Sequence, residues 1–151
     1  MKIVIPSEQA MQEFGLKLSR LLTGGVTLEL IGDVGAGKTT LTRSIARGLG
    51  ITDPIHSPTF TISNRYETPG GLLLAHYDFY RLSDAGIMKD ELAEVLENER
   101  TITIIEWGDI VEEILPDSRI TIRIRSESEN SRKLDCIAHN QLTQKILEQL
   151  Q

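Results

Sequence analysis

The stretch GDVGAGKTT, residues 32–40, places three glycines, one lysine and two threonines directly after the apolar run VTLELI. Gly32, Gly37, Lys38 and Thr39 fit the pattern G-x-x-x-x-G-K-[ST]. In that pattern backbone N–H groups surround phosphate oxygens, the lysine reaches the outer phosphates and the hydroxyl ligates Mg²⁺. A plain glycine-rich turn needs neither side chain at this offset. The segment therefore predicts a site for a nucleoside triphosphate with magnesium.

The pattern also assigns a role to each residue at the start of the following helix. Lys38 is predicted to act on the outer phosphates as a catalytic cation, and Thr39 is predicted to ligate Mg²⁺. Thr40 adds a polar group near the inner phosphates, where the helix N-terminus is partially positive. The predicted nucleotide-binding residues of the segment are Gly35, Ala36, Gly37, Lys38, Thr39 and Thr40.

A phosphate-binding loop of this kind needs a carboxylate for the metal at the end of a neighbouring apolar strand. Glu106 ends the apolar run TITII, and Asp78 follows LLLAHY. Both are expected at the carboxyl edge of a sheet, where α/β folds bind ligands. Glu106 is favoured as the metal ligand over a surface acid, because an apolar run leads directly into it. For Asp78, a functional carboxylate and a turn residue are equal alternatives.

The segment SPTFTI, residues 57–62, follows the predicted loop helix. Many nucleotide hydrolases carry a loop at this place that responds to the γ-phosphate. Pro58 stiffens the entry to the segment, and Thr59 offers a hydroxyl. From spacing alone, an ordinary loop that leads into a strand is the simpler interpretation.

Four segments carry a more specific signal, because GDVGAGKTTLTR, SPTFTISNRYE, HYDFYRL and IIEW occur in this order with little between them. The chain resembles the TsaE family, small P-loop ATPases of bacterial tRNA threonylcarbamoyladenosine synthesis, over about residues 1–107. The P-loop alone is generic, whereas SPTF together with H-x-D-x-Y-R and IEW is specific to this family.

The resemblance implies a P-loop NTPase fold, and residues 1–151 are expected to form a single P-loop ATPase domain. It implies ATP and Mg²⁺ as ligands and weak hydrolysis by the isolated chain. The implied partners are TsaD-like and TsaB-like proteins, and tRNA is reached only through their complex. In this role ATP binding and hydrolysis support repeated formation of threonylcarbamoyladenosine in tRNA.

The family roles are carried over to matching positions of this sequence. Asp78 is expected to be the catalytic carboxylate, and Glu106 the second metal ligand, directly or through water. Thr59 is expected to act in catalysis as part of a switch-like loop. Trp107 is expected to support the site or a partner contact. The stretch Ser7–Glu8 matches a segment that lies near the nucleotide base in the family, so Glu8 is expected to bind the nucleotide.

Three other function classes compete with this interpretation. A small-molecule kinase shares the P-loop but usually adds an arginine-rich lid, and no arginine cluster lies between the predicted helices. A GTPase is expected to carry N-K-x-D, which is absent from the sequence. A pure binding module has no need of Asp78 and Glu106 together. An autonomous P-loop ATPase or a kinase is therefore the main alternative.

Elements that position these residues follow from the hydrophobic pattern. Strand–helix alternation predicts an α/β three-layer sandwich, with a mostly parallel sheet and two antiparallel additions. Ser7 and Asn140 are predicted helix N-caps. Strands are predicted over 3–5, 26–31, 59–66, 71–80, 101–107, 118–126 and 132–139, and helices over 8–24, 38–49, 89–98 and 141–150.

Composition limits the partners and the compartment. The net charge of −6 and a pI near 5.1 disfavour nucleic acid as the main partner, because phosphate binding depends on lysine and arginine, and no binding to DNA is expected. Cys136 is the single cysteine and excludes an internal disulfide, which favours a reducing, cytoplasmic location. It is expected to be a small core residue. No apolar run approaches the roughly 20 residues that span a bilayer.

Arginines form one further pattern near the C-terminus. Arg119, Arg123 and Arg125 alternate along one predicted strand, so they share one face of it. Such a face is usually only solvated, although it also suits RNA or an acidic partner. Arg132 and Lys133 open the next strand and are expected to join this face across the hairpin.

Overall fold

The structure is a computed structural model that describes residues 1–58 and 62–151. Serine and asparagine side chains cap two of its helices as predicted: Ser7 accepts from the N–H of Ala10, and Asn140 accepts from that of Thr143. The elements in chain order are β1 (Lys2–Ile5), α1 (Glu8–Ser19), β2 (Thr27–Ile31), α2 (Lys38–Gly48), β3 (Ser63–Glu67), β4 (Leu73–Asp78), α3 (Ile87–Glu97), β5 (Thr101–Glu106), the 3-10 helix η1 (Gly108–Ile114), β6 (Arg119–Ser126), β7 (Arg132–Ala138) and α4 (Gln141–Leu150).

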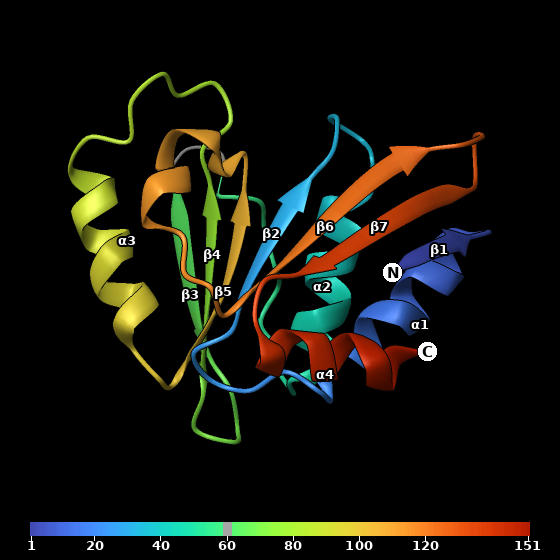
Figure 1. The fold of residues 1–151 in the computed structure, drawn as a ribbon, viewed down its shortest axis with the longest axis horizontal. Coiled ribbons are helices and arrows are strands. Elements are labelled where there is room, and N and C mark those ends of the chain that lie inside the picture. Colours follow the sequence, from blue (N-terminus) through green and yellow to red (C-terminus); the bar gives the residue numbers. More distant parts are fainter. Residues whose placement is uncertain (59–61) are drawn as a thin grey trace.

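These strands form one seven-stranded sheet in the order β1-β7-β6-β2-β5-β4-β3 (Figure 1). The four central strands β6, β2, β5 and β4 run parallel. At one edge β3 pairs antiparallel with β4, and at the other β7 pairs antiparallel with β6 and β1. The predicted α/β fold, with a parallel centre and antiparallel additions, is therefore confirmed.

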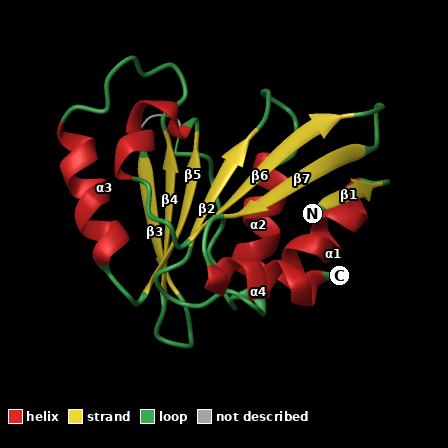
Figure 2. Cartoon of the chain, in the orientation of Figure 1, coloured by secondary structure: helices red, strands yellow, loops and turns green. Residues whose placement is uncertain are grey.

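Helices cover both faces of this sheet (Figure 2). Side chains alternate between the faces along each strand. Leu74 and Ile104 enter the core under α1, α2 and α4, whereas Tyr77 and Ile105 enter the core under α3 and η1. Even-numbered side chains of β4 and β5 therefore face the side of the sheet that carries α2.

Three local expectations need correction. Strand β3 begins at Ser63 rather than at Thr59. Ile62, the residue before it, lies in a bend with a φ of 66°. Helix α1 ends at Ser19, before the glycine pair at 24–25 that was expected to end it. The last strand residue before Trp107 is Glu106, because Trp107 takes a left-handed conformation with a φ of 56°.

Cys136 confirms the expectation of a small core residue. Its side chain lies in the core under α4, and the residue is 1% exposed. Burial raises the pKa of the thiol to about 11, so the reactive thiolate form is disfavoured. Among the helices of the described residues, no membrane-spanning candidate occurs, since none combines the required length and apolar character.

Two contacts between a glycine and a serine set how closely α1 approaches α2. A Cβ atom added at Gly15 would lie 2.5 Å from Cβ of Ser44, and one added at Gly48 would lie 1.9 Å from Oγ of Ser19. The two helices therefore touch where side chains are smallest, and α1 supports the helix that follows the phosphate-loop motif.

We expect Gly15→Ala to destabilise the chain. Alanine favours an isolated helix by about 1 kcal/mol over glycine, but overpacking a close helix contact costs about 1–3 kcal/mol. The measurement is the midpoint of urea unfolding. Gly70→Ala is the matched control, because the added Cβ would lie in ordinary van der Waals contact, 3.9 Å from Oγ1 of Thr68. An unchanged midpoint in Gly15→Ala would contradict this expectation, because it would mean that overpacking costs no more than the helix-propensity gain of about 1 kcal/mol.

Candidate functional site

The segment between β2 and α2 forms an open loop around the N-terminus of α2. Gly35 and Gly37 adopt positive φ angles of 79° and 111°, which residues with a Cβ rarely take. Gly37 is the N-cap of α2 and supplies no side-chain cap. The first N–H groups of this helix are therefore left for another acceptor, as at anion-binding helix N-termini.

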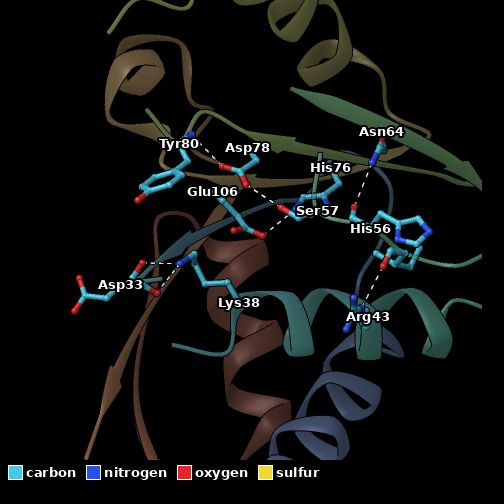
Figure 3. Close-up of polar contacts among 12 residues, drawn as sticks. Asp33, Lys38, Arg43, His56, Ser57, Asn64, His76, Asp78, Tyr80 and Glu106 are labelled. Atoms are coloured by element: carbon cyan, nitrogen blue, oxygen red, sulfur yellow. Dashed lines mark hydrogen bonds and ion pairs between the residues drawn. The ribbon is translucent and has the colours of Figure 1, made fainter. Parts of the chain in front are cut away.

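Lys38, the first residue of α2, folds back over this loop. Its Nζ donates to the carbonyl oxygens of Gly32 at 2.6 Å and Asp33 at 2.9 Å (Figure 3). The same atom lies 5.0 Å from the ring centroid of Trp107, a favourable cation–π distance. Lys38 is 6% exposed. A positive charge is thus held within the loop.

The two predicted acids lie on neighbouring strands next to this loop. In the parallel register Asp78 of β4 pairs with Glu106 of β5, and Glu106 also pairs with Leu30 of β2. Both carboxylates are on the even-numbered face that carries α2. Glu106 is 3% exposed and Asp78 is 9% exposed. The sheet therefore brings both acids to the edge where β2 leads into the loop.

His76 fixes the carboxylate of Glu106. The Nε2 atom of His76 lies 2.9 Å from Oε1 of Glu106, and the histidine is completely buried. In the described structure its Nδ1 atom has no hydrogen-bond partner. Because a carboxylate accepts, the donor of this hydrogen bond is assigned to Nε2 of His76. The hydrogen bond from His76 thereby fixes the orientation of the Glu106 carboxylate.

Asp78 is held at both oxygens. Ser57 donates its hydroxyl to Oδ2 at 3.0 Å, and the backbone N–H of Tyr80 donates to Oδ1 at 2.9 Å (Figure 3). The first residue of the SPTF segment therefore contacts the acid at the end of β4. Thr59, the residue predicted to act from this segment, lies outside the described residues.

Two cavities share Gly35 and Gly37 of the loop in their lining. The first, of about 380 Å³, is walled by Tyr80 and Trp107, whose ring centroids are 4.9 Å apart. Its lining includes the predicted residues Gly35, Gly37, Lys38, Thr39, Thr40, Asp78 and Glu106. The second, of about 230 Å³, is lined by Ser7, Glu8, Met11, Gly35, Ala36, Gly37, Thr40, Glu129, Asn130 and Arg132.

The predicted residues thus divide into two groups that share the loop. Lys38, Thr39 and the two acids meet at the first cavity, whereas Glu8 and Ala36 line the second cavity and not the first. The arrangement can place a phosphate chain over the helix N-terminus, with a charged end toward the acids and a nucleoside end toward Glu8. Sequence reasoning placed all of these residues at one site.

Three residues at the site were not singled out as functional from the sequence. Ser57 belongs to the SPTF segment, in which the sequence points to the hydroxyl of Thr59 instead. His76 precedes Asp78 by two residues on the same strand, so the period of two puts both on one face. This period indicates the face on which His76 lies, but it does not indicate that His76 contacts Glu106. Arg132 belongs to the far hairpin and gave no signal of proximity to the loop.

The expectation that Arg132 joins the arginine face is wrong. Lys133 does pair with Arg125 across the hairpin, whereas Arg132 pairs with Ser126. Successive residues of β7 point to opposite faces, so Arg132 turns toward the α2 side and reaches Ala36.

Comparison with known proteins extends these observations. The family model described as "Threonylcarbamoyl adenosine biosynthesis protein TsaE" matches residues 5–134. A Nostoc relative named tRNA threonylcarbamoyladenosine biosynthesis protein TsaE is 36% identical over 142 residues, covering 92% of this chain and 86% of the relative. A Haemophilus influenzae relative of the same name is 33% identical over 148 residues, covering 95% and 92%.

A solved structure shares the fold as well. The crystal structure of Bacillus subtilis YdiB superposes on this chain with a TM-score of 0.80 at 30% sequence identity, covering 99% of this chain and 93% of YdiB. Sequence and fold agree over nearly the whole length, and the chain belongs to the TsaE family.

Proposed function

We propose that this chain binds ATP with Mg²⁺ at the loop, hydrolyses it slowly, and so supports threonylcarbamoyladenosine formation in tRNA in the cytoplasm. Residues 1–151 act as one ATPase domain in this proposal. The observation that carries it is the convergence of Lys38, Thr39, Asp78 and Glu106 on one cavity of about 380 Å³. The names of the relatives supply the tRNA modification.

Oxygen donors at this cavity suit Mg²⁺. The hydroxyl of Thr39 and the carboxylates of Glu106 and Asp78 line it, and hard oxygen ligands are those that Mg²⁺ prefers. Among the described residues, no group of three or more His, Cys, Asp or Glu side chains is placed to hold a metal. Mg²⁺ commonly takes one or two protein oxygens and completes its shell with phosphates and water. When bound, it would neutralise charge on the outer phosphates.

The chain's own residues divide the remaining work. Lys38 supplies positive charge close to the outer phosphates, where negative charge spreads as the terminal bond breaks. Asp78, fixed at both oxygens by Ser57 and the Tyr80 N–H, is suited to orient a water molecule toward that phosphate. Since Ser57 belongs to the SPTF segment, a change in that segment reaches the catalytic acid directly.

Partner proteins complete the site in this proposal. The first cavity opens at the edge of the sheet, and water in an open site raises the local dielectric and weakens electrostatic stabilisation. Docking on TsaD-like and TsaB-like proteins would exclude that water, and a residue supplied in trans can accelerate phosphoryl transfer by about 10³–10⁵. Thr59 and its neighbours would report the nucleotide state to the partners.

Lys38→Ala is expected to reduce ATP affinity or hydrolysis at least about tenfold. A charge-assisted contact contributes about 1.5–3 kcal/mol, and this lysine is the cation held inside the loop. Titration calorimetry and phosphate release are the two measurements. Lys145→Ala, on the exposed side of α4, is the control and should leave both unchanged. Normal binding together with normal turnover in Lys38→Ala would reject the loop as the nucleotide site.

Substitutions of the two acids are expected to affect different steps, one hydrolysis and the other Mg²⁺-dependent binding. Asp78→Asn should keep ATP binding and lose hydrolysis, because it removes charge at the position that orients water. Glu106→Gln should instead reduce the gain in nucleotide affinity that Mg²⁺ provides, measured as the ratio of dissociation constants with and without EDTA. If Asp78→Asn hydrolyses ATP normally with the partners present, Asp78 has only a structural role.

Hydrolysis is expected to depend on the partners. Phosphate release should be slow for the isolated chain, rise when TsaD-like and TsaB-like proteins are added, and fall again in Thr59→Ala with the same partners. Formation of threonylcarbamoyladenosine in tRNA should stop after few turnovers when the chain is left out. A fast rate from the isolated chain, unaffected by partners, would support an autonomous ATPase, and phosphate transfer to a panel of acceptors would support a kinase.

A further inference from the structure

Arg132, the first residue of β7, reaches across the molecule to the phosphate loop. Its Nε atom donates to the carbonyl oxygen of Ala36 at 3.0 Å, although the two residues are 96 positions apart. Ala36 is the loop residue directly before Gly37. The contact therefore joins the tip of the β6–β7 hairpin to the segment that wraps the helix N-terminus.

The other hydrogen bonds of this guanidinium hold it to its own hairpin. Its Nη1 atom lies 3.1 Å from the carbonyl oxygen of Ser128, 3.1 Å from that of Glu129 and 3.0 Å from that of Ser131. The planar guanidinium presents its donors in a fixed fork. One side of the fork is thus anchored in the hairpin, and the other is aimed at the loop.

This contact has a geometric consequence for the phosphate site. In a trans peptide the carbonyl and the following N–H point in opposite directions. Because Arg132 draws the Ala36 carbonyl toward the hairpin, the N–H of Gly37 is turned the opposite way. The N–H of Ala36 is itself fixed, since it donates to the carbonyl of Asp33 at 3.0 Å. The peptide units on both sides of Ala36 are therefore constrained before any ligand binds.

We propose that Arg132 is a positioning residue for phosphate binding, which acts through the Ala36 carbonyl to preorganise the loop. The inference rests on the proposed nucleotide function and extends it to the β6–β7 hairpin. Arg132 also lines the second cavity together with Glu8 and Thr40. A direct contact between Arg132 and the nucleoside is the competing role, and the two roles differ in which part of the ligand they affect.

The test compares a ligand that has a nucleoside with one that lacks it. ADP and inorganic pyrophosphate are titrated into the wild type, Arg132→Met and Arg132→Lys, each in EDTA. If Arg132 acts through the loop, Arg132→Met weakens both ligands by the same factor, about tenfold for loss of a charge-assisted contact. Arg132→Lys keeps the charge but not the fork, so an intermediate, again equal, loss is expected.

Lys133→Met is the matched control. Lys133 is the next residue on the same strand, is exposed and pairs with Glu127 on the opposite face of the sheet. Its loss should leave both affinities unchanged. A lower affinity for ADP with an unchanged affinity for pyrophosphate would overturn the proposal and would indicate that Arg132 contacts the nucleoside. Unchanged affinity for both ligands would also overturn it and leave a purely structural link.

Two further measurements keep the test decisive. If Arg132→Met does not fold, Arg132→Lys alone carries the comparison, and amide exchange at Gly37 in that variant should be faster than in the wild type. Unchanged exchange at Gly37 would count against the proposal. If the wild type binds neither ligand, the nucleotide function itself fails, which differs from a loss confined to the Arg132 variants.

Discussion

The parallel pairing of β5 with both β2 and β4 is the constraint on which the site depends. It places Glu106 of β5 between Asp78 of β4 and Leu30 of β2, and β2 is the strand that leads into the phosphate loop. Three chain segments far apart in sequence therefore meet at the carboxyl ends of the parallel strands, where open α/β sheets bind ligands.

Burial gives this edge its chemical character. Glu106 and His76 are removed from water and meet each other at 2.9 Å, and polar groups in such a place are costly unless they are paired. The hydrogen bond therefore compensates the burial of both groups and fixes the orientation of the Glu106 carboxylate. Asp78 is fixed in the same way by Ser57 and the Tyr80 N–H. The acids are oriented by the folded chain before a ligand arrives.

Sequence reasoning succeeded where a local pattern carries the information. The spacing of Gly37, Lys38 and Thr39 located the loop, and apolar runs located the strands that end in Asp78 and Glu106. Strand order has no such local signature, so the adjacency of the two acids was an expectation that required the fold. The bend at Ile62 was missed because the β-forming residues around it favour a strand, and a positive φ for a β-branched residue is rare.

The hairpin contact of Arg132 was invisible for a different reason. Among the described residues, every acceptor that its guanidinium uses is a main-chain carbonyl, supplied by Ala36 and by the hairpin tip. A carbonyl is present whatever side chain the residue carries, so the contacts to Arg132 do not by themselves specify the residue types at positions 128, 129 and 131. An insertion or deletion would move the carbonyls themselves. The contacts of Arg132 therefore depend on the number of residues in this tip more than on their side chains.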